Sequence, residues 1–99
     1  MLHIINKSPL ERNALDACLA IAQDGATVLL IEDAVYAATR GNAAEAKLRD
    51  AQSRLKLCVL QPDLEARGMA ERLSEGIASV DYGGFVDLVA NHKNCQSWL

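Results

Sequence analysis

A short, almost entirely apolar run near the end of the first third of the chain constrains the fold most strongly. Residues 27–31 read Thr27-Val28-Leu29-Leu30-Ile31 and contain no charged side chain. Strands covered on one face alternate apolar and polar residues, whereas strands buried on both faces of a parallel sheet are apolar throughout. The run is also far too short for the roughly 20 residues that cross a bilayer. It therefore predicts a central strand with cover on both faces.

Further short apolar runs alternate with helical patterns along the chain. We expect strands at residues 2–5, 55–60 and 77–80, and an edge strand in the tail at 95–99. Helical patterns occupy the intervals, at residues 9–23, 34–39, 43–53, 62–68, 69–74 and 82–92. Such alternation implies strand–helix–strand units with right-handed crossovers. The sequence therefore predicts a small three-layer α/β sandwich, with residues 1–99 forming one domain.

Residues with good capping chemistry mark several predicted helix ends. Ser8 and Glu11 have the spacing of a capping box, and Pro9 would take the first helical position. Asp33 is expected to cap the segment that follows it, and Asp81 to start the last helix. Asp33 also ends a strand, where α/β proteins often place functional groups, but capping is a sufficient explanation. Capping likewise explains Ser8, which lies in no G-x-S-x-G motif.

Composition and motifs exclude several classes of function. The formal net charge is −3 and no cluster of Lys or Arg is present, which argues against direct nucleic-acid binding. No glycine motif for nucleotides occurs, and neither His3 nor His92 has a metal-ligand partner at short spacing. We expect no cofactor or metal, and packed or capping roles for both histidines. The N-terminus lacks a signal-peptide pattern, so a cytoplasmic protein is expected, with no membrane contact.

Three cysteines, at positions 18, 58 and 95, are separated by 40 and 37 residues. This odd number and wide spacing fit neither a disulfide framework nor a zinc site, and indicate reduced thiols. Cys58 lies in a predicted buried strand, where a free cysteine packs as a small hydrophobic residue. Cys95 is expected to be accessible, with only Lys93 nearby to stabilise a thiolate.

Cys18 is the candidate for chemistry, because the predicted first helix holds it in a defined position. At 100° per residue, Leu15, Cys18, Leu19 and Ala22 share one apolar face. Core packing is the competing explanation for that placement. Cys18 also lies in the later half of its helix, where the helix dipole raises rather than lowers a thiol pKa. A reactive Cys18 would therefore need help from another subunit or from a nearby cation.

Two segments of the chain are recognisable: Pro62-Asp63-Leu64-Glu65-Ala66-Arg67-Gly68 and Val80-Asp81-Tyr82-Gly83-Gly84-Phe85-Val86-Asp87-Leu88. Together with the segments that follow, they make the chain as a whole resemble the DsrH family and its close kin TusB. Cys18 favours the DsrH side. The other matching segments are residues 2–4, 7–13, 25–33, 36–38, 55–57 and 96–99. No single motif is decisive, but their order and spacing cover nearly the whole chain.

The resemblance implies properties that composition and spacing do not. It implies a DsrE/DsrF/DsrH-like α/β sandwich around a mostly parallel, five-stranded sheet. It implies a heterohexamer with DsrE-like and DsrF-like (TusD-like and TusC-like) subunits, and transfer of sulfur to a DsrC-like or TusE-like carrier. The main sulfur-accepting cysteine of such a sulfurtransferase lies on the DsrE/TusD-type subunit. In DsrH-type chains a cysteine stands on the first helix, where this chain has Cys18, whereas TusB-type chains generally lack it.

Three hypotheses follow. The first is a sulfur-relay subunit in dissimilatory sulfur oxidation, with Cys18 as an auxiliary persulfide site. Persulfide relay needs a thiolate and a docking surface, and it requires no metal or nucleotide. The second is a non-catalytic assembly subunit in which Cys18 is merely packed. The third is a TusB-like subunit of the relay for 2-thiolation of the tRNA wobble uridine, in which other subunits would hold the tRNA.

Overall fold

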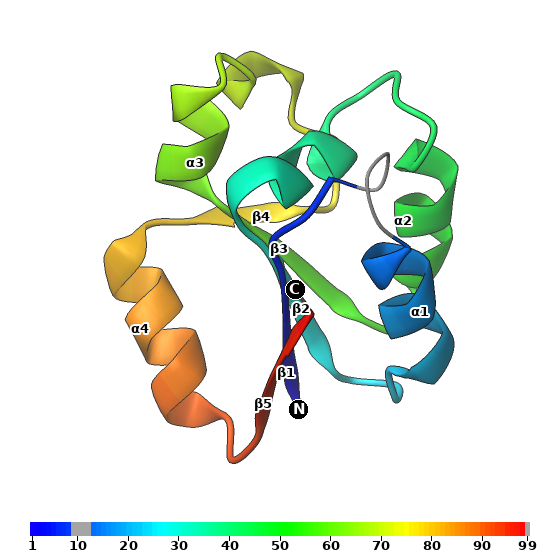
Figure 1. The fold of residues 1–99 in the computed structure, drawn as a ribbon, viewed down its shortest axis with the longest axis vertical. Helices are drawn as coiled ribbons and strands as arrows, with labels where there is room; N and C mark the ends of the chain where they lie inside the picture. The colour runs from blue at the N-terminus through cyan, green and yellow to red at the C-terminus, as the bar shows by residue number, and fades with distance from the viewer. Residues whose placement is uncertain (9–12, 99) are drawn as a thin grey trace.

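Five parallel strands form one sheet at the centre of the computed structural model, which describes residues 1–8 and 13–98 (Figure 1). In chain order they are β1 (Leu2–Ile5), β2 (Thr27–Leu30), β3 (Lys56–Leu60), β4 (Ala78–Val80) and β5 (Cys95–Trp98). Their spatial order is β4-β3-β2-β1-β5. All four residues of the central strand β2 are buried, which confirms the prediction made from its apolar run.

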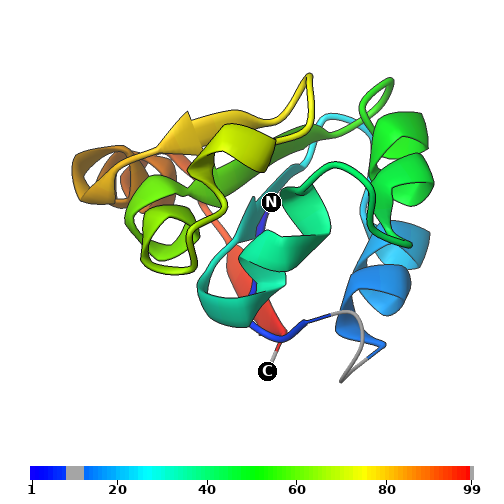
Figure 2. The same cartoon turned by 90° about the horizontal axis from the view of Figure 1, so that it is seen from above.

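Helical elements cover the two faces of the sheet unequally. The larger core cluster takes residues from α1 (Ala14–Ile21), the 3₁₀ helix η1 (Glu32–Ala38), α2 (Glu45–Ala51) and α3 (Gln61–Ala66). A short 3₁₀ turn, η2 (Ala70–Arg72), follows α3. The smaller cluster, on the opposite face, is closed by α4 (Tyr82–Asn91) through Phe85 and Leu88 (Figures 1 and 2). The three-layer sandwich is therefore confirmed. No helix in the described part of the chain has the length and apolarity to span a membrane.

The direction of the last crossover explains why α4 lies on the opposite face of the sheet from the other helices. The chain steps from β1 through β2 and β3 to β4 in one direction, then returns past all of them to place β5 beside β1. Right-handed crossovers that run in opposite directions along a sheet put their helices on opposite faces. Asp81 caps α4 as predicted, since its side chain accepts a hydrogen bond of 2.7 Å from the Gly84 backbone amide.

Two predicted helix starts have different outcomes. The capping box of Ser8 and Glu11, with Pro9, lies partly outside the described residues, and α1 begins at Ala14. The prediction that Asp33 caps the next helix is wrong. That 3₁₀ helix already begins at Glu32, with Ile31 as its N-cap residue, and makes no side-chain capping bond. The Asp33 carboxylate instead pairs with Arg67 of the segment after α3, at 2.9 Å.

The edge strand β5 is fixed to β1 by side chains as well as by the strand ladder. The indole Nε1–H of Trp98 donates a hydrogen bond of 3.1 Å to Nδ1 of His3. His3 is buried, and burial, together with the positive N-terminus, lowers its pKa. Because Nδ1 accepts this bond, it carries no proton while the bond exists. The predicted packed role of His3 is therefore confirmed, with a partner 95 residues away.

The His3 contact makes stability depend on pH. The unfolded chain, with an ordinary histidine pKa near 6.5, binds more protons than the folded chain just below that value. The contribution of His3 is therefore complete above about pH 6.5 and is lost as pH falls towards the lowered folded pKa. We expect His3→Gln to reduce the change in unfolding free energy between about pH 7.5 and pH 5, measured by urea denaturation.

His92→Gln is the matched control, because it also removes one histidine but leaves the Trp98 contact intact. The control shows what the loss of a histidine by itself does to the pH dependence. An equal pH dependence in His3→Gln and in the unmodified chain would contradict the assignment.

Candidate functional site

The carboxyl ends of the strands, where α/β proteins usually place functional groups, hold a structural polar cluster. Glu32, directly after β2 and Ile31, has a backbone φ of +50°, which side chains other than glycine rarely adopt. Its amide donates a hydrogen bond of 2.7 Å to the Asp63 carboxylate, and its own carboxylate accepts one of 3.3 Å from Asn6. The carboxylates of Asp63 and Glu32 therefore both accept hydrogen bonds that link neighbouring loops.

Cys18 lies on the inner face of α1, with 0% of its surface exposed. It belongs to the larger core cluster, as do Leu15 and Ala22 of the predicted apolar stripe. Burial raises the pKa of the Cys18 thiol to about 11. The thiol is consequently protonated at neutral pH, and no partner thiol can reach it without an opening of this face. Its auxiliary persulfide role stays a prediction.

The other two thiols occupy different places. Cys58 is buried in the smaller cluster on the α4 face of the sheet, as predicted, and burial raises its pKa, with a smaller opposite effect from Lys56. Cys95 is exposed at the start of β5, beside Leu2 of β1, which confirms its predicted accessibility. The two buried thiols belong to core clusters on opposite faces of the sheet, so the fold does not assemble them into one site.

Neither histidine approaches a metal-binding arrangement in the part of the chain that the structure describes. No group of three or more His, Cys, Asp or Glu side chains there could hold a metal ion. Nδ1 of His92 lies 2.7 Å from the Leu88 carbonyl oxygen near the end of α4, which is the predicted capping role. Ser8 is buried and lines a surface groove.

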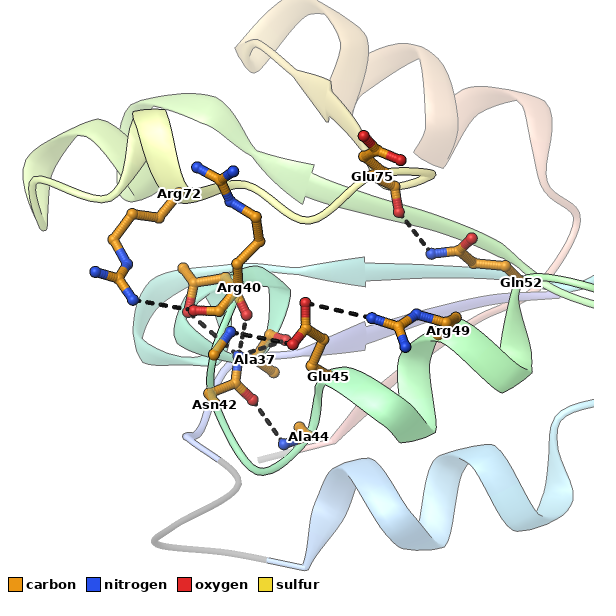
Figure 3. A network of polar contacts seen from close by, with 11 residues as sticks. Ala37, Arg40, Asn42, Ala44, Glu45, Arg49, Gln52, Arg72 and Glu75 are labelled. Carbon is orange, nitrogen blue, oxygen red and sulfur yellow. Dashed lines mark hydrogen bonds and ion pairs between the residues drawn. The ribbon is translucent and has the colours of Figure 1, made fainter.

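That groove, of about 610 Å³, is the feature that sequence reasoning missed. It runs along η1 and the loop after it, and its lining residues are Ser8, Asp33, Tyr36, Thr39, Arg40, Gly41, Asn42, Met69 and Arg72. Asn42 holds the loop in place (Figure 3): its side-chain amide donates to backbone carbonyls of residues 36, 37 and 39 and its oxygen accepts from the Ala44 amide. Because Arg40 and Arg72 are 32 residues apart, no local pattern in the sequence predicts that they meet.

Comparison with known proteins agrees with this architecture. The chain resembles the ychN protein of Escherichia coli with a TM-score of 0.78 and 16% identity, over 97% of both chains. It resembles MTH1491 of Methanobacterium thermoautotrophicum, a protein of unknown function, with a TM-score of 0.70 and 17% identity, over 97% of this chain and 95% of the other. At these identities the likeness establishes the fold.

Sequence comparison establishes the family. The family model described as "DsrH like protein" matches residues 7–95. Protein TusB of Pectobacterium parmentieri is 38% identical over 98 residues, which are 99% of this chain and 100% of the relative. Protein TusB of Escherichia coli O81 (strain ED1a) shows the same identity and coverage. The chain therefore belongs to the DsrH/TusB family of sulfur-relay complex subunits.

Proposed function

We propose that this chain is a non-catalytic assembly subunit of a cytoplasmic sulfur-relay complex, and that partner subunits carry the reacting sulfur. The observation that carries the proposal is the complete burial of Cys18 in the core, with its pKa raised to about 11. The role of the chain is then to complete and shape a complex with TusC-like and TusD-like subunits, from which a TusE-like carrier takes the sulfur.

The chemistry of relay explains why burial matters. A thiolate attacks the outer sulfur of a persulfide, a new sulfur–sulfur bond forms, and the donor leaves as a thiolate. With a pKa of about 11, roughly one Cys18 thiol in ten thousand is ionised at pH 7. The attacking sulfur must also meet the donor in line, and a side chain with 0% exposure offers no such approach. Cys18 meets neither requirement in this conformation.

Relatives named TusB favour the tRNA wobble-uridine thiolation relay over sulfur oxidation as the biological setting. The formal net charge of −3 fits a subunit that leaves tRNA to other proteins. The competing hypothesis, an auxiliary persulfide on Cys18 in a sulfur-oxidising complex, draws on the presence of a cysteine at this position of the first helix. That hypothesis requires partner binding to expose the thiol.

The first test is the reactivity of the thiols in the folded full-length chain. We expect iodoacetamide at about pH 8 to alkylate Cys95 quickly, because it is exposed, and to leave Cys18 and Cys58 unmodified until the protein unfolds. Peptide mass spectrometry after timed labelling measures each site. Cys95→Ser should abolish the fast phase, while Cys18→Ser should leave it unchanged. Fast labelling of Cys18 in the folded chain would contradict its burial.

The second test follows sulfur in the assembled complex. We expect a persulfide donor to add one sulfur atom, about 32 Da, to a partner subunit, and none to this chain at Cys18. Intact-mass spectrometry of the co-expressed complex measures this. A Cys18→Ser complex should still pass sulfur to the carrier at the unmodified rate, with Cys95→Ser as the matched control. Sulfur on Cys18, with loss of transfer in Cys18→Ser, would refute the proposal.

The third test decides the biological setting. Deleting the gene for this chain should remove 2-thiouridine from the wobble position of tRNA, because the relay complex loses a structural subunit. Nucleoside mass spectrometry measures the modification. Plasmid copies of the unmodified chain and of Cys18→Ser should restore it equally. Unchanged 2-thiouridine in the deletion strain, together with impaired growth on reduced sulfur compounds, would favour the sulfur-oxidation hypothesis.

A further inference from the structure

Two of the arginines in the described part of the chain differ from the rest in having no carboxylate partner. Arg49, Arg54 and Arg67 pair with carboxylates: Glu45 at 3.6 Å, Asp24 at 3.4 Å and Asp33 at 2.9 Å, respectively. Arg40 and Arg72, by contrast, form no ion pair among the described residues. Both line the groove along η1. Both side chains are exposed at the surface, so each guanidinium can reach an anion that enters the groove.

The backbone brings these two arginines together and orients them. An antiparallel bridge joins Thr39 to Leu73, and the Arg40 amide donates to the Arg72 carbonyl at 2.7 Å. The two side chains run in different directions (Figure 3). Nη2 of Arg40 donates to the Glu71 carbonyl at 2.6 Å. Nη2 of Arg72 donates to the Arg40 carbonyl at 3.1 Å. Each guanidinium has five N–H donors, so each keeps most of them for a ligand.

The hollow between the two arginines has room for an anionic group. Arg40, Gly41 and Arg72 are the described residues that line a hollow of about 340 Å³, and all three also line the groove. Asp33 lines the same groove, but its charge is already compensated by Arg67 at 2.9 Å. Planar guanidinium groups match carboxylates and phosphates through paired hydrogen bonds.

The rest of the groove identifies the kind of molecule that carries the anion. A neighbouring hollow of about 320 Å³ shares Ser8, Tyr36 and Asn42 with the groove and has Ala43 and Ala44 in its wall. Among the described residues, the one cation that lines it is Lys47, which pairs with Asp16 at 2.7 Å. In the part of the groove that the described residues form, positive charge without a carboxylate partner is therefore confined to one end. A nucleic acid presents a phosphate at every nucleotide and needs a track of cations.

We propose that this groove binds an extended, acidic segment of a partner protein. A carboxylate of that segment sits between Arg40 and Arg72, and its neighbouring apolar side chains extend towards Tyr36, which is 37% exposed. The proposal deepens the proposed function, since it rests on the chain acting within a complex of several proteins. The partner is defined by its chemistry: one carboxylate flanked by apolar residues.

The test is an NMR titration of the full-length, ¹⁵N-labelled chain with two blocked peptides, acetyl-Leu-Ala-Glu-Leu-amide and its Gln counterpart. We expect the Glu peptide to shift the backbone amides of Arg40, Gly41 and Arg72 saturably, and the Gln peptide to bind at least about tenfold more weakly. Equal shifts by the two peptides would overturn the proposal. The titration uses the chain alone, so its result is independent of whether the relay complex assembles as proposed.

Variants and competing probes complete the test. Arg40→Gln and Arg72→Gln should each weaken binding of the Glu peptide at least about tenfold, and Arg49→Gln, whose carboxylate partner is on its own helix, should not. Arg40→Lys and Arg72→Lys keep the positive charge but lack the planar guanidinium group, so they should weaken peptide binding less than the Gln variants do. These variants keep the proposal testable if a Gln variant fails to fold. Two competing probes are an RNA 12-mer of uridines and inorganic phosphate. The proposal would also be overturned if either probe shifted the same backbone amides to saturation at the concentrations needed for the Glu peptide.

Discussion

The need to cover both faces of β2 organises the whole molecule. This strand is buried along its entire length, so helices must lie above and below it. Successive crossovers in one direction place α1, η1, α2 and α3 on the same face. The crossover from β4 to β5 runs in the opposite direction, so its helix, α4, lies on the other face of the sheet. Among the described residues, the second layer therefore consists of one helix, α4, which packs through partly buried Phe85 and Leu88.

The same arrangement determines what each cysteine can do. The thick helical layer encloses Cys18 among small and branched apolar side chains, which raises its pKa and removes its access to partners. Cys58 faces the thin layer, and Cys95 stands on the edge strand. In this structure, partners can therefore reach the surface of the subunit but not the Cys18 thiol. Among the described residues, the groove with the Arg40 and Arg72 guanidiniums is the strongest feature for recognising a partner.

Local patterns in the sequence predicted the elements of this fold well. Apolar runs marked the buried strands β1, β2 and β3, because a buried strand must be apolar wherever it lies in the sheet. β4 and the edge strand β5 also form where the sequence analysis expected them. Asp81 was predicted as a cap because capping involves only residues within one turn. Asp33 was assigned the same role and does not fill it, because Arg67 competes for its carboxylate from 34 residues away. The auxiliary persulfide role of Cys18, which drew on the family resemblance and on its helix face, stays a prediction. A helix face shows which way a side chain points and not how deeply it is buried.

What the sequence by itself determined is therefore the type and order of the elements, the family, and the apolar face on which Cys18 lies. Only the tertiary structure decided the contacts between distant residues: Trp98 with His3, Arg67 with Asp33, and Arg40 with Arg72. The physical reason is that hydrophobic periodicity and capping act within a few residues, whereas these pairs depend on strand order and crossover direction. Burial of the Cys18 thiol belongs to the second group, because the packing of several elements sets it together.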